Sequence, residues 1–496
     1  MSDGADRPVR PKKPANKTLS MGRGGAGGGK ESGRGELEPA KRGPNAASAT
    51  TAPSALERVR QAARRDPKQK FTALLHHIYA VERLRSAYFA LRRGASAGVD
   101  GVTWQQYGQD LERNLEDLSD RLARGAYRAR PTRRARIPKS GGRDRLIGVP
   151  ALEDKIAQRA TVEVLQCIYE EDFLGFSYGF RPGRNQHMAL DAVSVGIRKR
   201  KVNWVLDADI RGFFDTLDHG WLVTFLEHRI ADKRVVRLIQ KWLKAGVLED
   251  GKRTRSTVGA VQGGSISPLL ANIYLHYVLD LWTQRWRKRA AGDVIVIRYA
   301  DDFVVGFQHR EEAERYLAEV TDRFEGFGLE LNVKKTRLIE FGRFAALGRA
   351  KRGESKPETF DFLGFTHACG KTAKGWFAVR RWTRRKSWQA KLREVRTELR
   401  KRRHQPIPEQ GQYVAAVIRG HCNYYGIAGN SKAITSFRFA VVQAWRRALS
   451  RRSQKGHVPW RRMRRLIHRY CPPARVRFTD PDGHLASSIR GRSPVR

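Results

Sequence analysis

The stretch that most constrains the fold is Val294 to Phe307, which reads "VIVIRYADDFVVGF". Two apolar runs rich in β-branched residues flank a short polar connection, and this pattern is typical of an antiparallel β-hairpin. We expect strands at 294–297 and 303–307. Asp301 and Asp302 then lie at the tip of an apolar hairpin. Two ionised carboxylates there repel each other and lose hydration unless a cation compensates.

An isolated Asp-Asp pair is usually a solvated turn, so a second acidic site has to decide its role. That site is "WVLDADIRGFFDTLDH" at 204–219, which contains four aspartates. Trp204 to Leu206 predict a strand. Asp209 lies at the end of this apolar run, and the strand would place it beside the hairpin. Asp209, Asp301 and Asp302 offer the oxygen ligands that Mg²⁺ accepts together with substrate phosphates. The sequence therefore predicts a site for two Mg²⁺ ions, with Mn²⁺ as a possible substitute.

The balance of charges indicates the class of partner. The 496 residues include 97 Lys and Arg against 50 Asp and Glu, which gives a net charge of +47. Such an excess favours a polyanion. No apolar run approaches the roughly 18 residues that a membrane-spanning helix needs, so we expect no membrane partner. The four cysteines lie far apart without a CxxC pair, which argues against a disulfide framework and against a zinc module.

Composition also divides the chain. Residues 1–54 are rich in Gly, Ser, Ala, Pro, Lys and Arg, and they predict a disordered basic tail. Residues 55–370 begin with amphipathic helices and continue with short strands and helices mixed. Beyond about residue 372 the pattern is helical and basic. We therefore expect a helical domain at 371–450 and a basic, nucleic-acid-binding segment at 451–496.

Eight blocks, taken in order, resemble the reverse transcriptases encoded by bacterial group II introns. They are "AGVDGVT" at 97–103, "IPKSGGRDRLIGVPALEDKIAQ" at 137–158, "SYGFRPGRNQHMAL" at 177–190, the Asp209 block, "QGGSISPLLANIYLHYVLD" at 262–280, "YADD" at 299–302, "GLELNVKKT" at 328–336 and "FDFLGF" at 360–365. The resemblance covers roughly residues 57–496 and is closest to members that lack the endonuclease. It implies an α+β, right-hand polymerase fold, in which fingers and a palm with an antiparallel sheet precede an α-helical thumb or maturase domain.

The chain departs from the family pattern at two places. Val261 stands where the family commonly has Pro, and Arg145, Leu146 and Ile147 stand where it has Arg-Pro-Leu. Neither departure touches a predicted metal ligand.

The resemblance also implies roles for single residues. Asp209 and Asp301 would hold two Mg²⁺ ions in catalysis, with Asp302 in support. The residues implied to contact the incoming nucleotide are Lys139, Arg145, Phe214 and Gln262. Without the resemblance, the sequence would indicate that Lys139 and Arg145 are exposed cations of a solvated hairpin loop and that Phe214 is a core residue.

Further cations are candidates for contacts with nucleic acid. Arg181 and Arg184 alternate with aromatic residues, a pattern that suits a template strand whose bases stack and whose phosphates pair with cations. A place in the apolar core is the equal alternative for these aromatic residues. The remaining predicted contacts are Lys335, Arg384, Arg385 and Lys386.

The implied function is that of an RNA-directed DNA polymerase that also binds group II intron RNA as a maturase. It would support splicing and retrohoming by target-primed reverse transcription, through two-metal-ion nucleotidyl transfer. Its partners would be an RNA template, a DNA primer, dNTPs and intron RNA, in the bacterial cytoplasm at the nucleoid or in a ribonucleoprotein.

Two alternatives remain open. One is a domesticated reverse transcriptase with a defence or CRISPR-associated role. The other is a splicing-only, RNA-binding maturase, against which the intact Asp209, Asp301 and Asp302 argue. Intron RNA domains beside the gene would favour the maturase over the domesticated enzyme.

Overall fold

The computed structural model describes residues 54–138, 144–249, 252–254, 259, 263–453, 456–479, 481 and 482. The expected N-terminal tail therefore lies outside the described residues, except for Ser54, which caps the first helix. The described part mixes helices with three small sheets, so it is α+β as expected. Among the described helices, none is long and apolar enough to cross a membrane.

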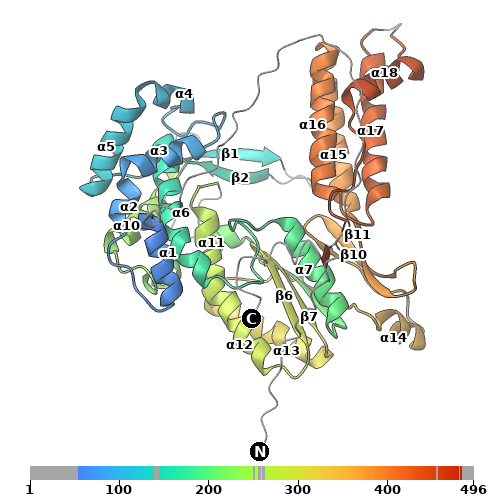
Figure 1. The fold of residues 1–496 in the computed structure, drawn as a ribbon, viewed down its shortest axis with the longest axis horizontal. Coiled ribbons are helices and arrows are strands. Elements are labelled where there is room, and N and C mark those ends of the chain that lie inside the picture. The colour runs from blue at the N-terminus through green and yellow to red at the C-terminus, as the bar shows by residue number, and fades with distance from the viewer. Residues whose placement is uncertain are drawn as a thin grey trace, which may run out of the picture. The chain divides into compact units, whose positions relative to one another are not determined.

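The N-terminal region is built around a long helix, α6, that is buried on most of its surface. Apolar residues occupy nearly every turn of α6, and the helices α1, α2 and α3 pack around it. A small sheet of order β2-β1-β4-β5 lies in the same region (Figure 1). The elements are α1 Ala55–Arg65, α2 Leu75–Tyr79, α3 Val81–Ala90, α4 Trp104–Tyr107, α5 Leu111–Ala123, β1 Thr132–Pro138, β2 Asp144–Val149, α6 Leu152–Asp172, α10 Lys233–Lys244, β4 Val247–Glu249 and β5 Lys252–Thr254.

The central sheet has the order β6-β7-β3-β8, with antiparallel pairing throughout. The predicted hairpin is confirmed, and each of its strands extends to the turn at Ala300 and Asp301. Its elements are α7 Gln186–Lys199, β3 Trp204–Asp209, α8 Phe213–Thr216, α9 His219–Glu227, α11 Ser267–Leu275, a π-helical turn His276–Asp280, α12 Leu281–Arg289, β6 Val294–Tyr299, β7 Asp302–Phe307, α13 Arg310–Gly326, β8 Arg337–Glu340 and α14 Ala345–Lys351.

Both faces of the central hairpin are covered, which explains why its strands are apolar throughout. Successive side chains of a strand point to opposite faces. Ile295 and Ile297 belong to the apolar core shared with α7, while Val294 and Val296 belong to the core shared with α13. Figure 1 shows α7 beside β6 and β7. The hairpin is therefore held on two sides, and its charged residues are confined to the buried Arg298 and to the tip.

The C-terminal region starts with strands, which corrects the expectation of a helical pattern from about residue 372. Residues 365–383 form a β-hairpin, and the first helix begins at Arg385. The many cations of this stretch masked its period-2 alternation of buried and exposed positions. The elements are β9 Phe360–Phe362, β10 Phe365–Lys371, β11 Phe377–Thr383, α15 Arg385–Lys401, α16 Ile407–Tyr425, α17 Ser431–Ser450 and α18 Trp460–Tyr470.

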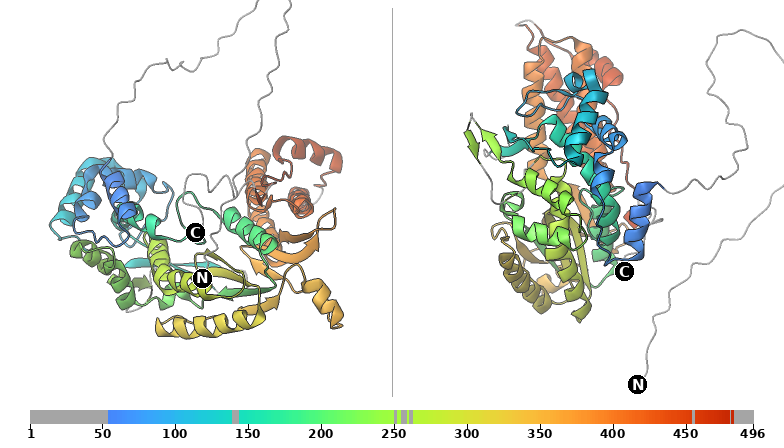
Figure 2. Two further views of the ribbon diagram at one scale, coloured as in Figure 1. Left: turned by 60° about the horizontal axis from the view of Figure 1, so that its bottom comes forward. Right: turned by 90° about the vertical axis from the view of Figure 1, so that its left-hand side faces the viewer.

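One apolar core joins the four C-terminal helices, which run close together in both views of Figure 2. Leu392, Val395 and Leu399 of α15 form the buried stripe that their spacing predicts. Met463 of α18 is fully buried in the same core. The expected boundary at residue 450 therefore falls inside one packed core, since Val458, Met463 and Cys471 belong to it. Phe478 and Asp482 lie farther along the chain and contact α7 instead.

Candidate active site at the tip of the central hairpin

Strand register brings the two acidic stretches of the sequence together. In the antiparallel pair of β3 and β7, Asp209 is the direct partner of Asp302. Directly opposed residues of such a pair have Cβ atoms about 5 Å apart. Asp301 precedes Asp302 in the turn. The three predicted carboxylates thus come from one end of the central sheet.

Asp209 has two partners from the loop that follows α13. Lys335 Nζ donates to Asp209 Oδ2 at 2.7 Å, and Asn332 Nδ2 donates to the same oxygen at 3.0 Å. The backbone N–H of Asn332 also donates to the carbonyl of Asp209 at 2.8 Å. Lys335, predicted to contact nucleic acid, therefore lies at the acidic site and supplies positive charge there.

The surroundings of Asp302 and Asp207 disfavour the charged forms of these two carboxylates. The pKa of Asp302 is raised to about 6, chiefly by burial and also by the negative charges of Asp301 and Asp209, while Lys335 acts to lower it. Asp302 is exposed at the start of β7, although protein atoms crowd its carboxylate group. Burial likewise raises the pKa of Asp207 to about 7, against the effect of Arg337. A bound cation would relieve this repulsion.

The chemistry of the donors fits a hard cation such as Mg²⁺, which prefers carboxylate oxygens. The contact with Lys335 shows that the Asp209 carboxylate accommodates a positive charge at close range. In the part of the chain that the structure describes, no cluster of three or more His, Cys, Asp or Glu side chains is arranged so that it could hold a metal ion. The carboxylates are thus near neighbours that do not converge on one point in this conformation.

The residues predicted to contact the nucleotide are only partly visible. Lys139 and Gln262 lie outside the described residues. The backbone of Arg145 lies in β2, opposite Ile137 of β1. Phe214 lies in α8 and is half-buried, with its ring centroid 5.5 Å from that of Phe213.

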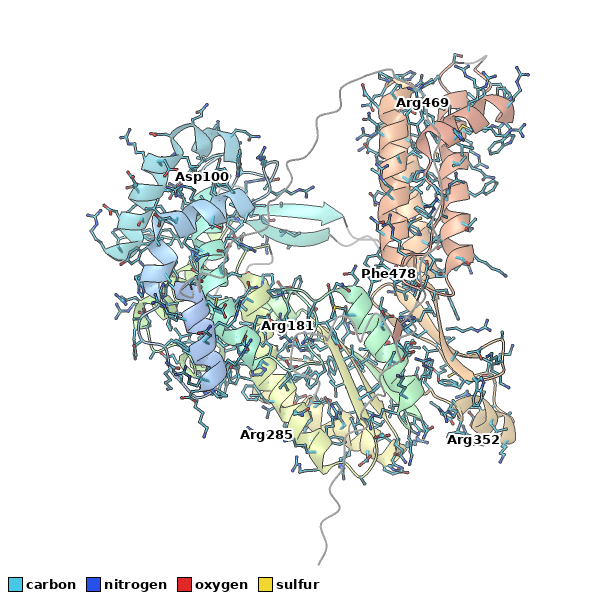
Figure 3. The ribbon with its side chains drawn as sticks, viewed as in Figure 1. Asp100, Arg181, Arg285, Arg352, Arg469 and Phe478 are labelled. Atoms are coloured by element: carbon cyan, nitrogen blue, oxygen red, sulfur yellow. The ribbon has the colours of Figure 1, made fainter. Side chains whose placement is uncertain are left out.

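The structure places Arg181 in the interior, and this corrects the prediction that it contacts nucleic acid. Only 5% of Arg181 is exposed. Its guanidinium pairs with Glu170 and donates to the carbonyls of Leu174 at 2.8 Å and Ser177 at 2.9 Å. In Figure 3, Arg181 lies inside the molecule, whereas exposed arginines such as Arg285 lie at its edge. Arg181 thus holds the loop that contains Ser177.

Arg184 is also used inside the molecule. Its guanidinium donates to the carbonyls of Gly175 and Ser177 and lies over the Tyr178 ring, 5.2 Å from the centroid. The side chain is half-buried. The basic and aromatic pattern of this stretch is therefore explained by internal packing.

The cations at the start of α15 are placed differently. Arg384 precedes the helix and pairs with Asp361 at 2.9 Å, while Arg385 and Lys386 are exposed in the first turn. That turn contains no acidic residue. Arg384 lowers the pKa of Asp302, which places its charge near the hairpin tip.

Sequence reasoning missed four polar residues around the site. Asp207 lies two positions before Asp209 on the same strand, and its acidity within an apolar run was a usable signal. Arg298 is a cation inside the apolar run of β6, which signals a buried partner. Asn332 and Asp280 gave no local signal, because their roles depend on tertiary contacts.

Residues 137–367 match the family described as "Reverse transcriptase (RNA-dependent DNA polymerase)". The protein YkfC of Escherichia coli K12 is 36% identical over 309 residues, which cover 55% of this chain and 81% of YkfC. The chain belongs to the reverse transcriptase family. Its enzyme class is therefore that of RNA-directed DNA polymerases.

Other members of the family carry names that refer to introns. The group II intron-encoded protein LtrA of Lactococcus lactis subsp. cremoris is 34% identical over 234 residues, which are 46% of this chain and 38% of LtrA. Nuclear intron maturase 2 of Arabidopsis thaliana is 30% identical over 110 residues, which are 21% of this chain and 14% of that protein. These similarities confirm the resemblance to reverse transcriptases of group II introns. The chain spans well under half the length of either relative.

Proposed function

We propose that this reverse transcriptase copies RNA into DNA at an active site formed by Asp209, Asp301 and Asp302. The observation that carries the proposal is the register of β3 and β7, in which Asp209 is the direct partner of Asp302. Three carboxylates at one end of the central sheet suit the transfer of nucleotides, because positioning and electrostatics supply most of the catalysis in such reactions.

Asp209 and Asp301 would be the ligands of two Mg²⁺ ions, with Asp302 in support. When bound, Mg²⁺ would lower the pKa of the primer hydroxyl and stabilise the charge of the leaving pyrophosphate. The Lys335 ammonium, which contacts Asp209, would remain close enough to pair with a phosphate of the growing strand. Phe214 would lie under the sugar of the incoming nucleotide, with Lys139, Arg145 and Gln262 as further contacts.

The start of α15 is the part of the C-terminal region best suited to a phosphate backbone. Helix N-termini attract anions, yet Arg385 and Lys386 occupy this one with no acidic residue in the turn. Exposed Trp382 lies just before them. Cations at a positive helix end repel each other unless an anion is present, so a nucleic acid strand would stabilise this arrangement.

A second surface of this region combines stacked aromatic rings with cations. Phe439 and Trp460 are exposed, and their rings are nearly parallel with centroids 6.5 Å apart. Arg446 lies over Trp460 at 4.6 Å from the ring centroid. Such surfaces bind single-stranded or looped RNA. We assign the helical region to a thumb and maturase domain that binds the primer and template and group II intron RNA.

The wider role that fits this assignment is that of an intron maturase in the bacterial cytoplasm, acting in splicing and in retrohoming by target-primed reverse transcription. The similarity to LtrA supports it. A domesticated reverse transcriptase in defence remains the second candidate. Intron RNA domains flanking the gene would support the maturase, and their absence would favour the second candidate.

Primer extension on an RNA template tests the assignment of the active site. Changing Asp301 and Asp302 together to Ala should lower the rate by at least about 100-fold, because the transition state loses its metal ligands. The matched control is Asp322→Ala, which removes an exposed carboxylate of α13. Full activity of the double variant would refute the assignment.

A further inference from the structure

The residue just before Asp301 has an unusual backbone conformation. Ala300 has φ +58°, in the left-handed region that residues with a Cβ seldom adopt. This conformation turns the chain at the tip of the hairpin. It therefore sets the positions and directions of the two residues that follow, Asp301 and Asp302. Something in the surrounding structure has to hold Ala300 in this state.

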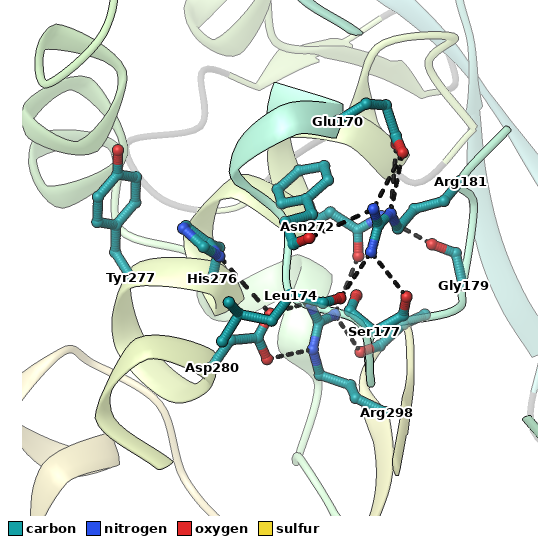
Figure 4. A network of polar contacts seen from close by, with 12 residues as sticks. Glu170, Leu174, Ser177, Gly179, Arg181, Asn272, His276, Tyr277, Asp280 and Arg298 are labelled. Atoms are coloured by element: carbon teal, nitrogen blue, oxygen red, sulfur yellow. Dashed lines mark hydrogen bonds and ion pairs between the residues drawn. The ribbon is translucent and has the colours of Figure 1, made fainter. Parts of the chain in front are cut away.

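A buried arginine holds the carbonyl of this residue. Arg298, on β6, is fully buried, and its Nη1 donates to the carbonyl oxygen of Ala300 at 3.0 Å. The same guanidinium binds both carboxylate oxygens of Asp280, at 2.7 and 2.5 Å, and donates to Asn272 Oδ1 at 2.9 Å (Figure 4). One rigid, planar group therefore connects the hairpin tip to two points on the helices behind it.

The loop around Ser177 also packs against the tip, and its backbone pairs with that of Arg298. Asn272 Nδ2 donates to the carbonyl of Gly179 at 2.8 Å. Gly179 lies so close to the hairpin that a Cβ there would be 2.3 Å from the Ala300 nitrogen. Arg181 fixes this loop from behind through the carbonyl of Ser177. The tip is thus clamped between a glycine and a guanidinium.

Packing alone does not explain this arrangement. A buried ion pair is often no more stabilising than an apolar pair of similar size, because both charges lose their hydration. The guanidinium differs from an apolar side chain in its directed donors, one of which reaches the carbonyl of the strained residue. The buried guanidinium of Arg298 therefore serves to fix the backbone geometry at Ala300.

We propose that Arg298, together with Asp280 and Asn272, is a positioning group that presets Ala300 and thereby aims Asp301 and Asp302. The inference rests on the proposed function of these two carboxylates. Arg298 does not touch a substrate in this assignment, and it acts through the backbone of the hairpin tip.

The test is amide hydrogen exchange of the peptide that covers residues 298–303, in full-length protein without metal, combined with primer-extension kinetics. The variant is Arg298→Met with Asp280→Leu, which removes the directed donors and leaves no unpaired charge. We expect exchange at the tip to rise at least about tenfold because the closed state is less stable. We expect kcat to fall at least about tenfold, with KM for dNTP changed less than about threefold.

A matched control removes a buried ion pair elsewhere. Arg229 and Asp172 pair at 3.1 Å in the N-terminal region, and Arg229 also donates to the carbonyl of Asp66. Arg229→Met with Asp172→Leu should leave exchange at the hairpin tip as in the wild type. Equal effects of the two double variants on the tip would mean a general loss of stability and would overturn the proposal.

Two further variants keep the test decisive if the double variant folds poorly. Arg298→Lys keeps the charge but cannot reach Asp280, Asn272 and Ala300 together, so tip exchange should still rise. Adding Ala300→Gly should restore part of the lost kcat, because glycine adopts positive φ without steric strain. Wild-type exchange and kcat in Arg298→Lys, or no recovery with Ala300→Gly, would overturn the proposal.

The exchange readout separates this inference from the proposed function. If the wild type fails to extend a primer while the Arg298 variants still loosen the tip, the proposed function fails and the positioning of the tip holds. If the wild type is active and the tip is unchanged in the variants, the positioning role fails alone.

Discussion

At the scale of single residues, the fold holds two carboxylates at the site, those of Asp302 and Asp207, in surroundings that disfavour their charged forms. Asp302 and Asp207 both have a raised pKa, chiefly because of burial. Asp209, Asp301 and Asp302 were predictable as a group from their places in the sequence. Asp209 ends one apolar run, and Asp301 and Asp302 connect two others. Arg181 was misjudged because sequence does not distinguish an arginine that binds buried carbonyls from one that binds phosphate.

A buried carboxylate of α6, outside the set of proposed metal ligands, predicts a pH dependence of stability. Asp154 is buried, it accepts hydrogen bonds from the Tyr127 hydroxyl and the Arg130 N–H, and burial raises its pKa to about 6. The folded state therefore binds this proton more tightly than the unfolded state. The contribution of Asp154 to the free energy of unfolding should rise as pH falls from 7 towards 4.

The comparison is urea unfolding at pH 7 and pH 4.5 for the wild type and for Asp154→Asn. The variant lacks this titration, so the pH-dependent change should differ between the two proteins by about 2 kcal/mol. The same pH dependence in both proteins would contradict the assignment.

At the scale of elements, the hairpin β6–β7 was predictable because two apolar runs rich in β-branched residues and a polar turn between them are local signals. Its support was not predictable. Gly179, Asn272 and Asp280 come from distant parts of the chain and meet the tip only through tertiary packing. The strand β11 lay in the stretch expected to be helical, and it was missed because Arg380 and Arg381 hid its apolar alternation.

The close contact of the loop with the hairpin predicts that Gly179→Ala is damaging. Its Cβ would lie 2.3 Å from the backbone nitrogen of Ala300, so the loop or the tip has to move. We expect a loss of about 1–3 kcal/mol in the free energy of unfolding and a lower rate of primer extension. Gly94→Ala is the control, since a Cβ there has no neighbour within 4 Å. Wild-type stability and rate in Gly179→Ala would show that the contact is unimportant.

At the scale of the whole molecule, the net charge of +47 is the property that determines the partner. It was sufficient to predict a nucleic acid from composition, since polyanions release counterions when such a protein binds. Composition could not say which cations make the contacts. That depends on burial, which separates Arg181 from exposed cations such as Arg385 and Lys386.

The salt dependence of RNA binding tests these assignments. Affinity should fall at least about tenfold between 50 and 200 mM salt, and Arg385→Ala with Lys386→Ala should reduce the slope of log K against log salt by about 2. Filter binding to a structured RNA gives both values. Arg285→Ala with Lys288→Ala, exposed cations of α12, should leave the slope unchanged. An equal reduction of the slope in both double variants would mean that RNA binds to the overall positive charge and not to a defined surface.

The most direct test of the central claim is single-nucleotide incorporation by Asp209→Asn on an RNA template, with RNA affinity measured on the same protein. Asp209 comes from a different strand than Asp301, and only the fold brings it to the hairpin tip. We predict that incorporation falls at least about 100-fold while RNA affinity stays within about threefold of the wild type. Incorporation at the wild-type rate would contradict the claim that this sheet edge is the polymerase active site.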